Sequence, residues 1–90
     1  MLKDKVAVIT GATRGIGNAT SKKFLENGCN VVIFGSKSET VLKALESLRK
    51  ENKNYDVKGF CPDLTNLKEV EEVFNKIKDL YGKIDILVIG

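Results

Sequence analysis

The chain has 90 residues, of which 42% are hydrophobic and 30% are charged, and its 15 basic and 12 acidic side chains give a formal net charge of +3. This length allows a single hydrophobic core, and the composition excludes a disordered tail, a collagen-like repeat and a low-complexity linker. The slight basic excess is dispersed along the chain, which argues against nucleic-acid binding, and no apolar run is long enough to cross a membrane.

The first three predicted elements are a strand, a helix and a second strand. Residues 5–10 contain an uninterrupted apolar run, which is typical of a strand covered on both faces in a parallel sheet. A helix is predicted from Gly15 to about Asn27, and Gly28 is well placed as the glycine that follows a helix end. Residues 30–34 repeat the strand pattern. The predicted inner face of the helix consists of Ile16, Ala19 and Phe24.

The middle of the chain predicts a second helix and a weaker third strand. Residues 36–39 read Ser-Lys-Ser-Glu, which fits a capping box that opens the helix. Residues 57–61 predict the strand, which Gly59 weakens because glycine adds neither packing nor order there. The predicted buried stripe of the helix consists of Val41, Ala44, Leu45 and Leu48.

A third helix and a fourth strand follow. The helix is predicted to begin after Thr65 and to end at Tyr81 and Gly82, and the strand is predicted over residues 84–89. The apolar stripe of this helix consists of Leu67, Val70, Val73, Phe74, Ile77 and Leu80.

Because strands and helices alternate throughout, we predict a single α/β domain over residues 1–90. Parallel strands joined by right-handed crossovers follow from this alternation. In doubly wound sheets of the dinucleotide-binding type, the strand order is 3-2-1-4. The first two helices are then expected to cover one face of the sheet and the third helix the other, giving a three-layer sandwich.

A glycine-rich segment joins the first strand to the first helix. Residues 10–17 read Thr-Gly-Ala-Thr-Arg-Gly-Ile-Gly, and glycines allow both a tight turn and a close approach of a phosphate to the backbone. The helix that follows offers N–H groups and a positive dipole end, so we predict a pyrophosphate site here. The alternative is a structural turn that binds nothing, against which Arg14 argues. A Walker A loop is excluded because no Gly-Lys-Ser/Thr follows.

This glycine loop resembles that of the classical short-chain dehydrogenases/reductases. Two further segments are similar to that family: Asp63-Leu64, after the third strand, and residues 81–88, which lead into the fourth strand. The sequence of the loop resembles that of bacterial 3-oxoacyl-acyl-carrier-protein reductases. The resemblance implies a partial Rossmann fold and NADP(H)-dependent reduction of a carbonyl, in a 3-oxoacyl thioester-like substrate of fatty acid biosynthesis, to an alcohol. The cofactor-binding residues it implies are Gly11, Thr13, Arg14, Gly15, Ile16, Gly17, Ser36, Lys37, Asp63 and Leu64.

The choice of cofactor follows from charge at the end of the second strand. Enzymes that bind NAD usually place a carboxylate there, on the ribose 2′-hydroxyl, whereas residues 34–37 read Phe-Gly-Ser-Lys. Arg14 and Lys37 are able to pair with a 2′-phosphate, and Ser36 is able to add a hydroxyl donor. We therefore predict NADP(H) rather than NAD(H). The alternative is that Lys37 is only a solvated charge near a helix start.

The presence of only two cysteines and no histidine argues against several other kinds of functional site. Cys29 and Cys61 are far apart in the sequence, which argues against a thiol redox pair or a zinc site, so we predict no metal. Both are predicted to be buried, reduced thiols of a cytoplasmic protein, and no secretion signal is recognised in the first residues. Without histidine, a Ser-His-Asp triad is excluded from this chain.

The family's catalytic serine and Tyr-x-x-x-Lys pair have no counterpart among the 90 residues. Lys58 follows Tyr55 at the wrong spacing, Tyr81 has Asp85 where lysine is required, and Ile89-Gly90 replaces the start of the family's Asn-Asn-Ala-Gly. We therefore expect the cofactor-binding half of a reductase, with the catalytic half absent, to be inactive alone. A small-molecule or acyl-carrier substrate is expected only for a full-length parent protein.

Two alternatives to a reductase half remain: a non-catalytic nucleotide-binding or interaction module, and a fragment without a ligand. An exposed fourth strand is expected to promote self-association.

Overall fold

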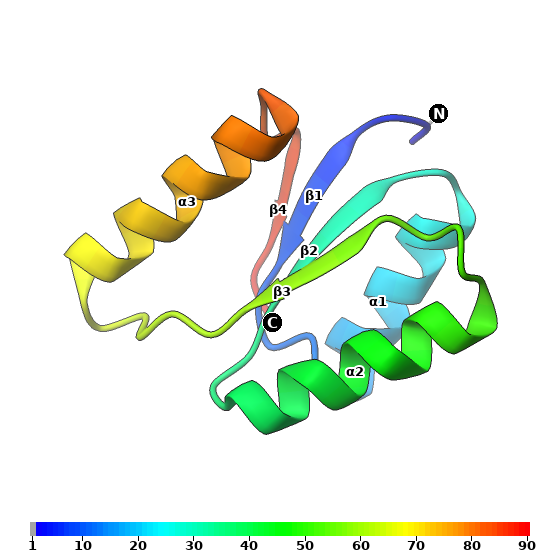
Figure 1. Cartoon of the computed structure of the whole chain (residues 1–90), viewed down its shortest axis with the longest axis horizontal. Coiled ribbons are helices and arrows are strands. Elements are labelled where there is room, and N and C mark those ends of the chain that lie inside the picture. The colour runs from blue at the N-terminus through cyan, green and yellow to red at the C-terminus, as the bar shows by residue number, and fades with distance from the viewer. Residues whose placement is uncertain (1) are drawn as a thin grey trace.

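The computed structural model describes residues 2–90 as a four-stranded parallel sheet flanked by three helices (Figure 1). The strand order is β3-β2-β1-β4, which confirms the predicted fold class and topology. In chain order the elements are β1 Val6–Ile9, α1 Gly15–Glu26, β2 Asn30–Phe34, α2 Ser38–Glu51, β3 Val57–Phe60, α3 Leu67–Tyr81 and β4 Ile86–Val88.

β2 has the predicted bounds, whereas β1, β3 and β4 are one to three residues shorter than predicted. The pairing of β1 with β4 continues past their ends. β1 lies between β2 and β4, with Val8 opposite Val32 on one side and Leu87 on the other. The Asp85 N–H donates to the Val6 carbonyl over 2.9 Å, and the Thr10 N–H donates to the Val88 carbonyl over 2.9 Å. β1 and β4 are therefore joined along their whole lengths, up to the loops that follow them.

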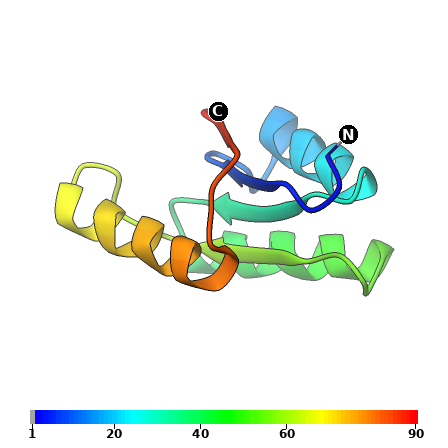
Figure 2. The same ribbon diagram turned by 90° about the horizontal axis from the view of Figure 1, so that it is seen from above.

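Two hydrophobic clusters form the core, one on each face of the sheet. Ala7 and Ile9 of β1 face α1 and α2, whereas Val6 and Val8 face α3. All four are buried, which explains the uninterrupted apolar run, since alternate side chains of a central strand enter opposite cores. Figures 1 and 2 show the resulting layers, with α3 alone on its side of the sheet.

The inner face of α1 differs from the prediction. Gly17, Ser21 and Leu25 are buried, whereas Ile16 is 86% exposed and Ala19 is exposed. Gly17 lies close against the backbone of the preceding loop: a Cβ there would lie 2.3 Å from the Gly11 carbonyl oxygen, so no larger residue fits. This contact fixes the rotation of α1 and turns Ile16 outward. Of the three predicted inner residues, Phe24 alone packs against the core, half-buried.

The predicted capping box at the start of α2 is not formed. Lys37 occupies the N-cap position and no side chain caps the helix there, so the hydroxyl of Ser36 is not used for capping. The four predicted core residues of α2 are all buried, as expected. Gly28 follows α1 with a φ of +85°, and the Cys29 N–H donates to the Phe24 carbonyl over 3.1 Å, so the predicted glycine-terminated helix end is confirmed.

α3 also ends as predicted, at Gly82 with a φ of +79°. Val73 and Ile77 of its stripe are buried, but Leu67 and Leu80 at its two ends are 73% and 56% exposed. Figure 2 shows that the first turns of α3 project beyond the strands, so no sheet surface lies beneath the start of this helix. The apolar stripe of α3 is therefore longer than the surface it covers.

Candidate functional site

A cleft of about 690 Å³ opens at the carboxyl ends of the four strands. It lies at the edge of the sheet where the loop after β1 leads to α1 on one face and the segment after β3 leads to α3 on the other, and open α/β sheets bind ligands at this edge. The segments that follow every strand contribute to its wall, together with Thr40 of α2 and Glu69 of α3. Phe34, the last residue of β2, also lines the cleft, and the segments after the strands supply Thr10, Gly11, Thr13, Arg14, Gly35, Ser36, Lys37, Cys61, Pro62, Asp63, Leu64 and Gly90.

Each of the three glycines at the junction of β1 and α1 is required for a structural reason. Gly11 and Gly15 have φ values of +60° and +62°, which side chains rarely adopt, and Gly17 has no space for a Cβ. The Ala12 N–H donates to the Phe34 carbonyl over 3.2 Å, which ties the loop to the end of β2. The backbone of α1 is thereby held close to the loop that precedes it.

The N-terminus of α1 is open to an anion. The first N–H groups of a helix have no acceptor within the helix, and here no side chain caps them and the first turn contains no acidic residue. Arg14 occupies the N-cap position and lines the cleft. Unpaired N–H groups, a positive dipole end and an adjacent guanidinium together favour a diphosphate.

One side of the cleft is basic. Arg14, Ser36 and Lys37 are all exposed and line it, and neither cation forms an ion pair within residues 2–90. Because Ser36 does not cap α2, its hydroxyl is available to a ligand. If Ser36 capped α2, its hydroxyl would be occupied by the helix and unavailable for a hydrogen bond to a ligand.

The opposite side of the cleft carries an apolar residue and a carboxylate. Leu64 is 60% exposed, and Asp63 accepts hydrogen bonds on Oδ1 from the Thr65 hydroxyl over 2.6 Å and from the Thr65 N–H over 2.9 Å. These two hydrogen bonds, the hydroxyl's first, hold the pKa of Asp63 below its usual value. The arrangement suits an adenine base, which presents a flat apolar face and an amino donor.

The structure therefore gathers seven of the ten predicted residues in one cleft, namely Gly11, Thr13, Arg14, Ser36, Lys37, Asp63 and Leu64. Gly15, Ile16 and Gly17 form the adjacent first turn of α1 without lining the cleft. The expectation that Ile16 packs the helix start is wrong, because its side chain projects into solvent.

Sequence reasoning missed Cys61 and Glu69 as cleft residues. The prediction that both cysteines are buried is correct for Cys29, whose thiol donates to the Lys5 carbonyl over 3.2 Å and whose pKa is raised by burial. It is wrong for Cys61, which is exposed. Its place just after β3 was the available signal, since parallel strands present their carboxyl ends to the site.

Asp85 and Thr10 hold β1 and β4 together at opposite ends of the pair, Asp85 at the amino ends of the strands and Thr10 at the cleft. Asp85 Oδ2 accepts from the Val6 N–H over 2.8 Å, and this hydrogen bond, followed by that from Lys83, holds the pKa of Asp85 below its usual value. The Gly90 N–H donates to Thr10 Oγ1 over 3.1 Å at the other end of the pair of strands. β1 and the end of the chain thus meet at the cleft in a fixed register.

Metal clusters and membrane-spanning helices are both absent from residues 2–90. No group of three or more His, Cys, Asp or Glu side chains within residues 2–90 is arranged to hold a metal ion. None of the three helices in this part of the chain has the length and apolar character needed to span a membrane.

Comparison with known proteins gives consistent matches over this architecture. The family model described as short chain dehydrogenase matches residues 5–90. A 3alpha-hydroxysteroid dehydrogenase of Mediterraneibacter gnavus is 47% identical over 88 residues, which are 98% of this chain and 35% of that protein. The chain thus spans about a third of the length of the curated relatives it matches.

Solved structures show the same fold. A short chain dehydrogenase from Bacillus anthracis superposes with a TM-score of 0.90 at 28% identity, covering 100% of this chain and 35% of that one. An actinorhodin polyketide ketoreductase solved with NADPH superposes with a TM-score of 0.88 at 27% identity, covering 100% of this chain and 34% of that one. The loop, the strand order and these matches agree, and the chain belongs to the short-chain dehydrogenase family.

Proposed function

We propose that this chain is the NADP(H)-binding part, residues 1–90, of a short-chain oxidoreductase that reduces a carbonyl group to an alcohol. The observation that carries the proposal is the uncapped N-terminus of α1, which adjoins a cleft that contains two cations without ion-pair partners within residues 2–90. Relatives solved with NADP and NADPH support the dinucleotide.

The cofactor would lie across the carboxyl ends of the strands. The amides of Gly15, Ile16 and Gly17 would bind the diphosphate, and Gly11 and Thr13 would line its path. Leu64 and Asp63 would contact the adenine. The exposed side chain of Ile16 is available to contact the cofactor beside the turn.

The basic side of the cleft would select NADP(H). Arg14 is able to form a bidentate pair with the 2′-phosphate, Lys37 adds a second charge, and Ser36 adds a hydroxyl donor. No carboxylate stands at the end of β2 to bind the ribose 2′-hydroxyl of NAD(H) instead.

The bound nicotinamide cofactor supplies the hydride, and the residues of this chain bind and orient it. No residue of the chain is proposed as catalytic, since neither tyrosine has the required lysine partner.

The sequence of the glycine loop supports a 3-oxoacyl thioester as the substrate, and hence a role in fatty acid biosynthesis. The hydroxysteroid dehydrogenase at 47% identity supports a steroid as the second candidate. A nucleotide-binding module without catalysis is the alternative to a reductase, and turnover by the 90-residue polypeptide would exclude it.

Cys61 offers a direct assay of nucleotide binding. A thiol reagent is expected to modify exposed Cys61 quickly and buried Cys29 slowly, because the reagent needs access and burial raises the pKa of Cys29. Saturating NADPH is expected to slow the fast reaction at least several-fold and to leave the slow one unchanged. The Cys61→Ser variant should lose the fast phase, and a fast rate that NADPH leaves unchanged would count against the proposed site.

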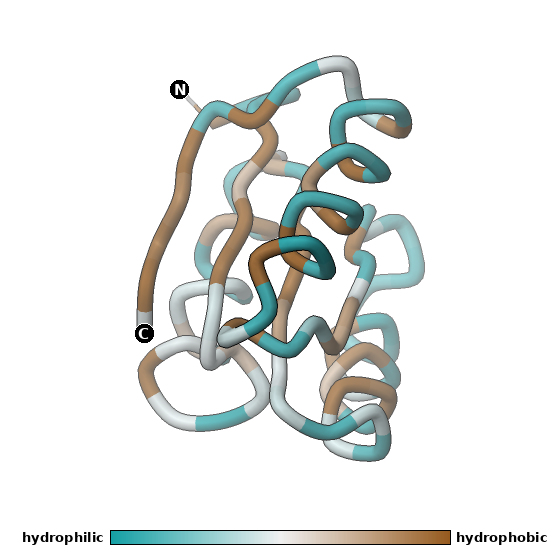
Figure 3. The backbone as a smooth tube through the Cα atoms, turned by 90° about the vertical axis from the view of Figure 1, so that its left-hand side faces the viewer, coloured by the Kyte–Doolittle hydropathy of each residue, from teal (hydrophilic) through white to brown (hydrophobic). Residues whose placement is uncertain are grey.

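We also propose that the 90-residue polypeptide self-associates through β4. At the other edge strand, β3, charged side chains oppose pairing with a further strand. Arg49 donates to the Val57 carbonyl over 2.7 Å, and Lys58 donates to Asp56 and Tyr81 on the opposite face. β4 has no such cover within residues 2–90, and Leu87 is 52% exposed. Figure 3 shows this apolar strand along one margin of the molecule. Unguarded apolar edges recruit other strands.

Sedimentation tests this association. The unaltered polypeptide is expected to form dimers or larger species, and Leu87→Lys is expected to shift it toward the monomer because a charge opposes edge pairing. Leu42→Lys, at an exposed site on α2, is the matched control and should leave the association unchanged. An unaltered chain that stays monomeric at high concentration would refute the proposal.

A further inference from the structure

Glu69, in the first turn of α3, reaches back to the segment that precedes the helix. Its Oε1 accepts from the Asp63 N–H over 2.9 Å, and its own N–H donates to Asn66 Oδ1 over 3.2 Å. A carboxylate in the first turn is also favoured by the helix dipole. Glu69 lines the cleft beside Asp63, although sequence reasoning assigned it no role.

The hydrogen bonds around Asp63 leave one of its polar atoms available. Glu69 binds its N–H, the Asn66 N–H donates to its carbonyl over 2.9 Å, and Thr65 donates twice to Oδ1. Oδ2 forms no hydrogen bond within residues 2–90. The two hydrogen bonds from Thr65 lower the pKa of Asp63, so the acceptor is ionised at neutral pH.

We infer that Glu69 is a positioning residue for base recognition: by holding the Asp63 N–H, it keeps Asp63 Oδ2 turned to accept a hydrogen bond from the 6-amino group of adenine. The inference rests on the proposed function, because it requires a nucleotide in the cleft. Glu69 itself need not touch the base. Its effect is to fix a turn in which Thr65 and Asn66 restrain the other atoms of Asp63.

The test compares two dinucleotides that differ at a single group of the base. NADPH carries the 6-amino donor, whereas its deamino form, with hypoxanthine in place of adenine, carries an oxygen there. Glu69→Ala is expected to weaken NADPH binding about tenfold, the effect of one charged hydrogen bond, and deamino-NADPH binding less than about twofold. Glu69→Gln should bind both nearly as the unaltered chain does, because its amide oxygen still accepts from the Asp63 N–H.

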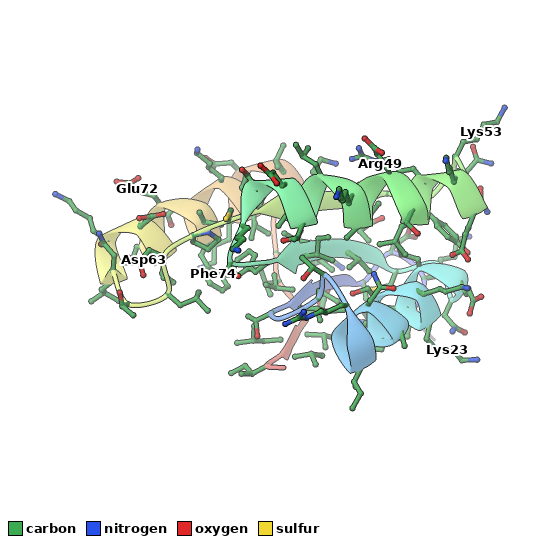
Figure 4. All side chains as sticks on the ribbon, turned by 90° about the horizontal axis from the view of Figure 1, so that it is seen from below. Lys23, Arg49, Lys53, Asp63, Glu72 and Phe74 are labelled. Atoms are coloured by element: carbon green, nitrogen blue, oxygen red, sulfur yellow. The ribbon has the colours of Figure 1, made fainter. Side chains whose placement is uncertain are left out.

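Two further variants separate positioning from general effects. Glu72→Ala removes the same charge from an exposed position on the same helix and should change neither affinity (Figure 4). Thr65→Val removes the hydroxyl that donates to Asp63 and should reproduce the base-selective loss, which keeps the test decisive if Glu69→Ala fails to fold.

The outcomes distinguish this inference from the proposed function. If Glu69→Ala and Thr65→Val weaken binding of the two dinucleotides equally, or not at all, the role of Glu69 is refuted while nucleotide binding stands. If the unaltered chain binds neither dinucleotide, the proposed function fails and this inference fails with it. A selective loss for NADPH, with rescue by Glu69→Gln, confirms the inference.

Discussion

Replacing Gly17 with alanine is expected to abolish NADPH binding and to lower the melting temperature by about 10 °C or more. The new Cβ would lie 2.3 Å from the Gly11 carbonyl oxygen and 2.9 Å from its carbon, and backbone atoms have no rotamer by which to move aside. Overpacking of this kind costs about 1–3 kcal/mol or more, and each kcal/mol lowers the melting temperature of a domain of this size by roughly 4–8 °C. Thermal melts and NADPH titration measure both effects.

Gly82→Ala is the matched control for this substitution. Gly82 has a φ of +79°, but a Cβ added there would meet no heavy atom within 4 Å, and the residue lies at the end of α3 away from the cleft. The alanine there should cost about 1 kcal/mol, from backbone strain alone, and leave NADPH affinity unchanged. A Gly17→Ala chain as stable and as tightly bound to NADPH as the control would contradict the close packing of α1 on the loop.

The double substitution Arg14→Ala and Lys37→Ala is expected to remove the preference for NADP(H). Each charged hydrogen bond to the 2′-phosphate that is lost should weaken NADPH binding roughly 10- to 100-fold. NADH lacks this phosphate, so its affinity should change far less, and the ratio of the two dissociation constants should approach one. Nucleotide fluorescence titrations with both cofactors measure this ratio.

Lys50→Ala and Lys53→Ala together provide the control, since both lysines are exposed near the far end of α2 and lie outside the cleft. They lower the net charge by the same amount as the double substitution. If they reduce the NADPH preference as much, the selection is a general effect of charge. If the unaltered chain binds NADH as tightly as NADPH, the assignment of the basic side of the cleft is wrong.

The buried strands and the α2 core could be predicted because apolar side chains mark them, and the strand order followed from the alternation of strands and helices together with the topology of doubly wound sheets. Continuous apolar runs marked the buried strands, and the stripe from Val41 to Leu48 matched the helical period of α2. The rotation of α1 could not be predicted in this way. Its inner face contains Gly17 and Ser21, whose inward positions follow from a backbone contact with Gly11 rather than from hydrophobicity.

The glycine loop could be predicted to lie at the cleft because three of its residues are conformationally or sterically restricted to glycine. Glu69 and Cys61 could not, because their positions depend on the path of the chain after β3. Residues 61–66 turn back toward the cleft through hydrogen bonds to Thr65, Asn66 and Glu69, and no periodic pattern encodes such a turn. The same limit applies to Ser36, whose spacing to Glu39 suggested a cap that the backbone does not form.

Backbone amide shifts during titration of the isotope-labelled chain with NADPH test the central claim most directly. The account predicts saturable shifts for the loop residues 11–17, with accompanying shifts at 35–37 and 61–64. It predicts none at the remote cluster formed by Asp56, Lys58 and Tyr81, which are joined by hydrogen bonds of 2.7–3.0 Å. Saturable shifts confined to other parts of the chain, or no shift at 11–17 with NADPH in large excess, would contradict a diphosphate site at the start of α1.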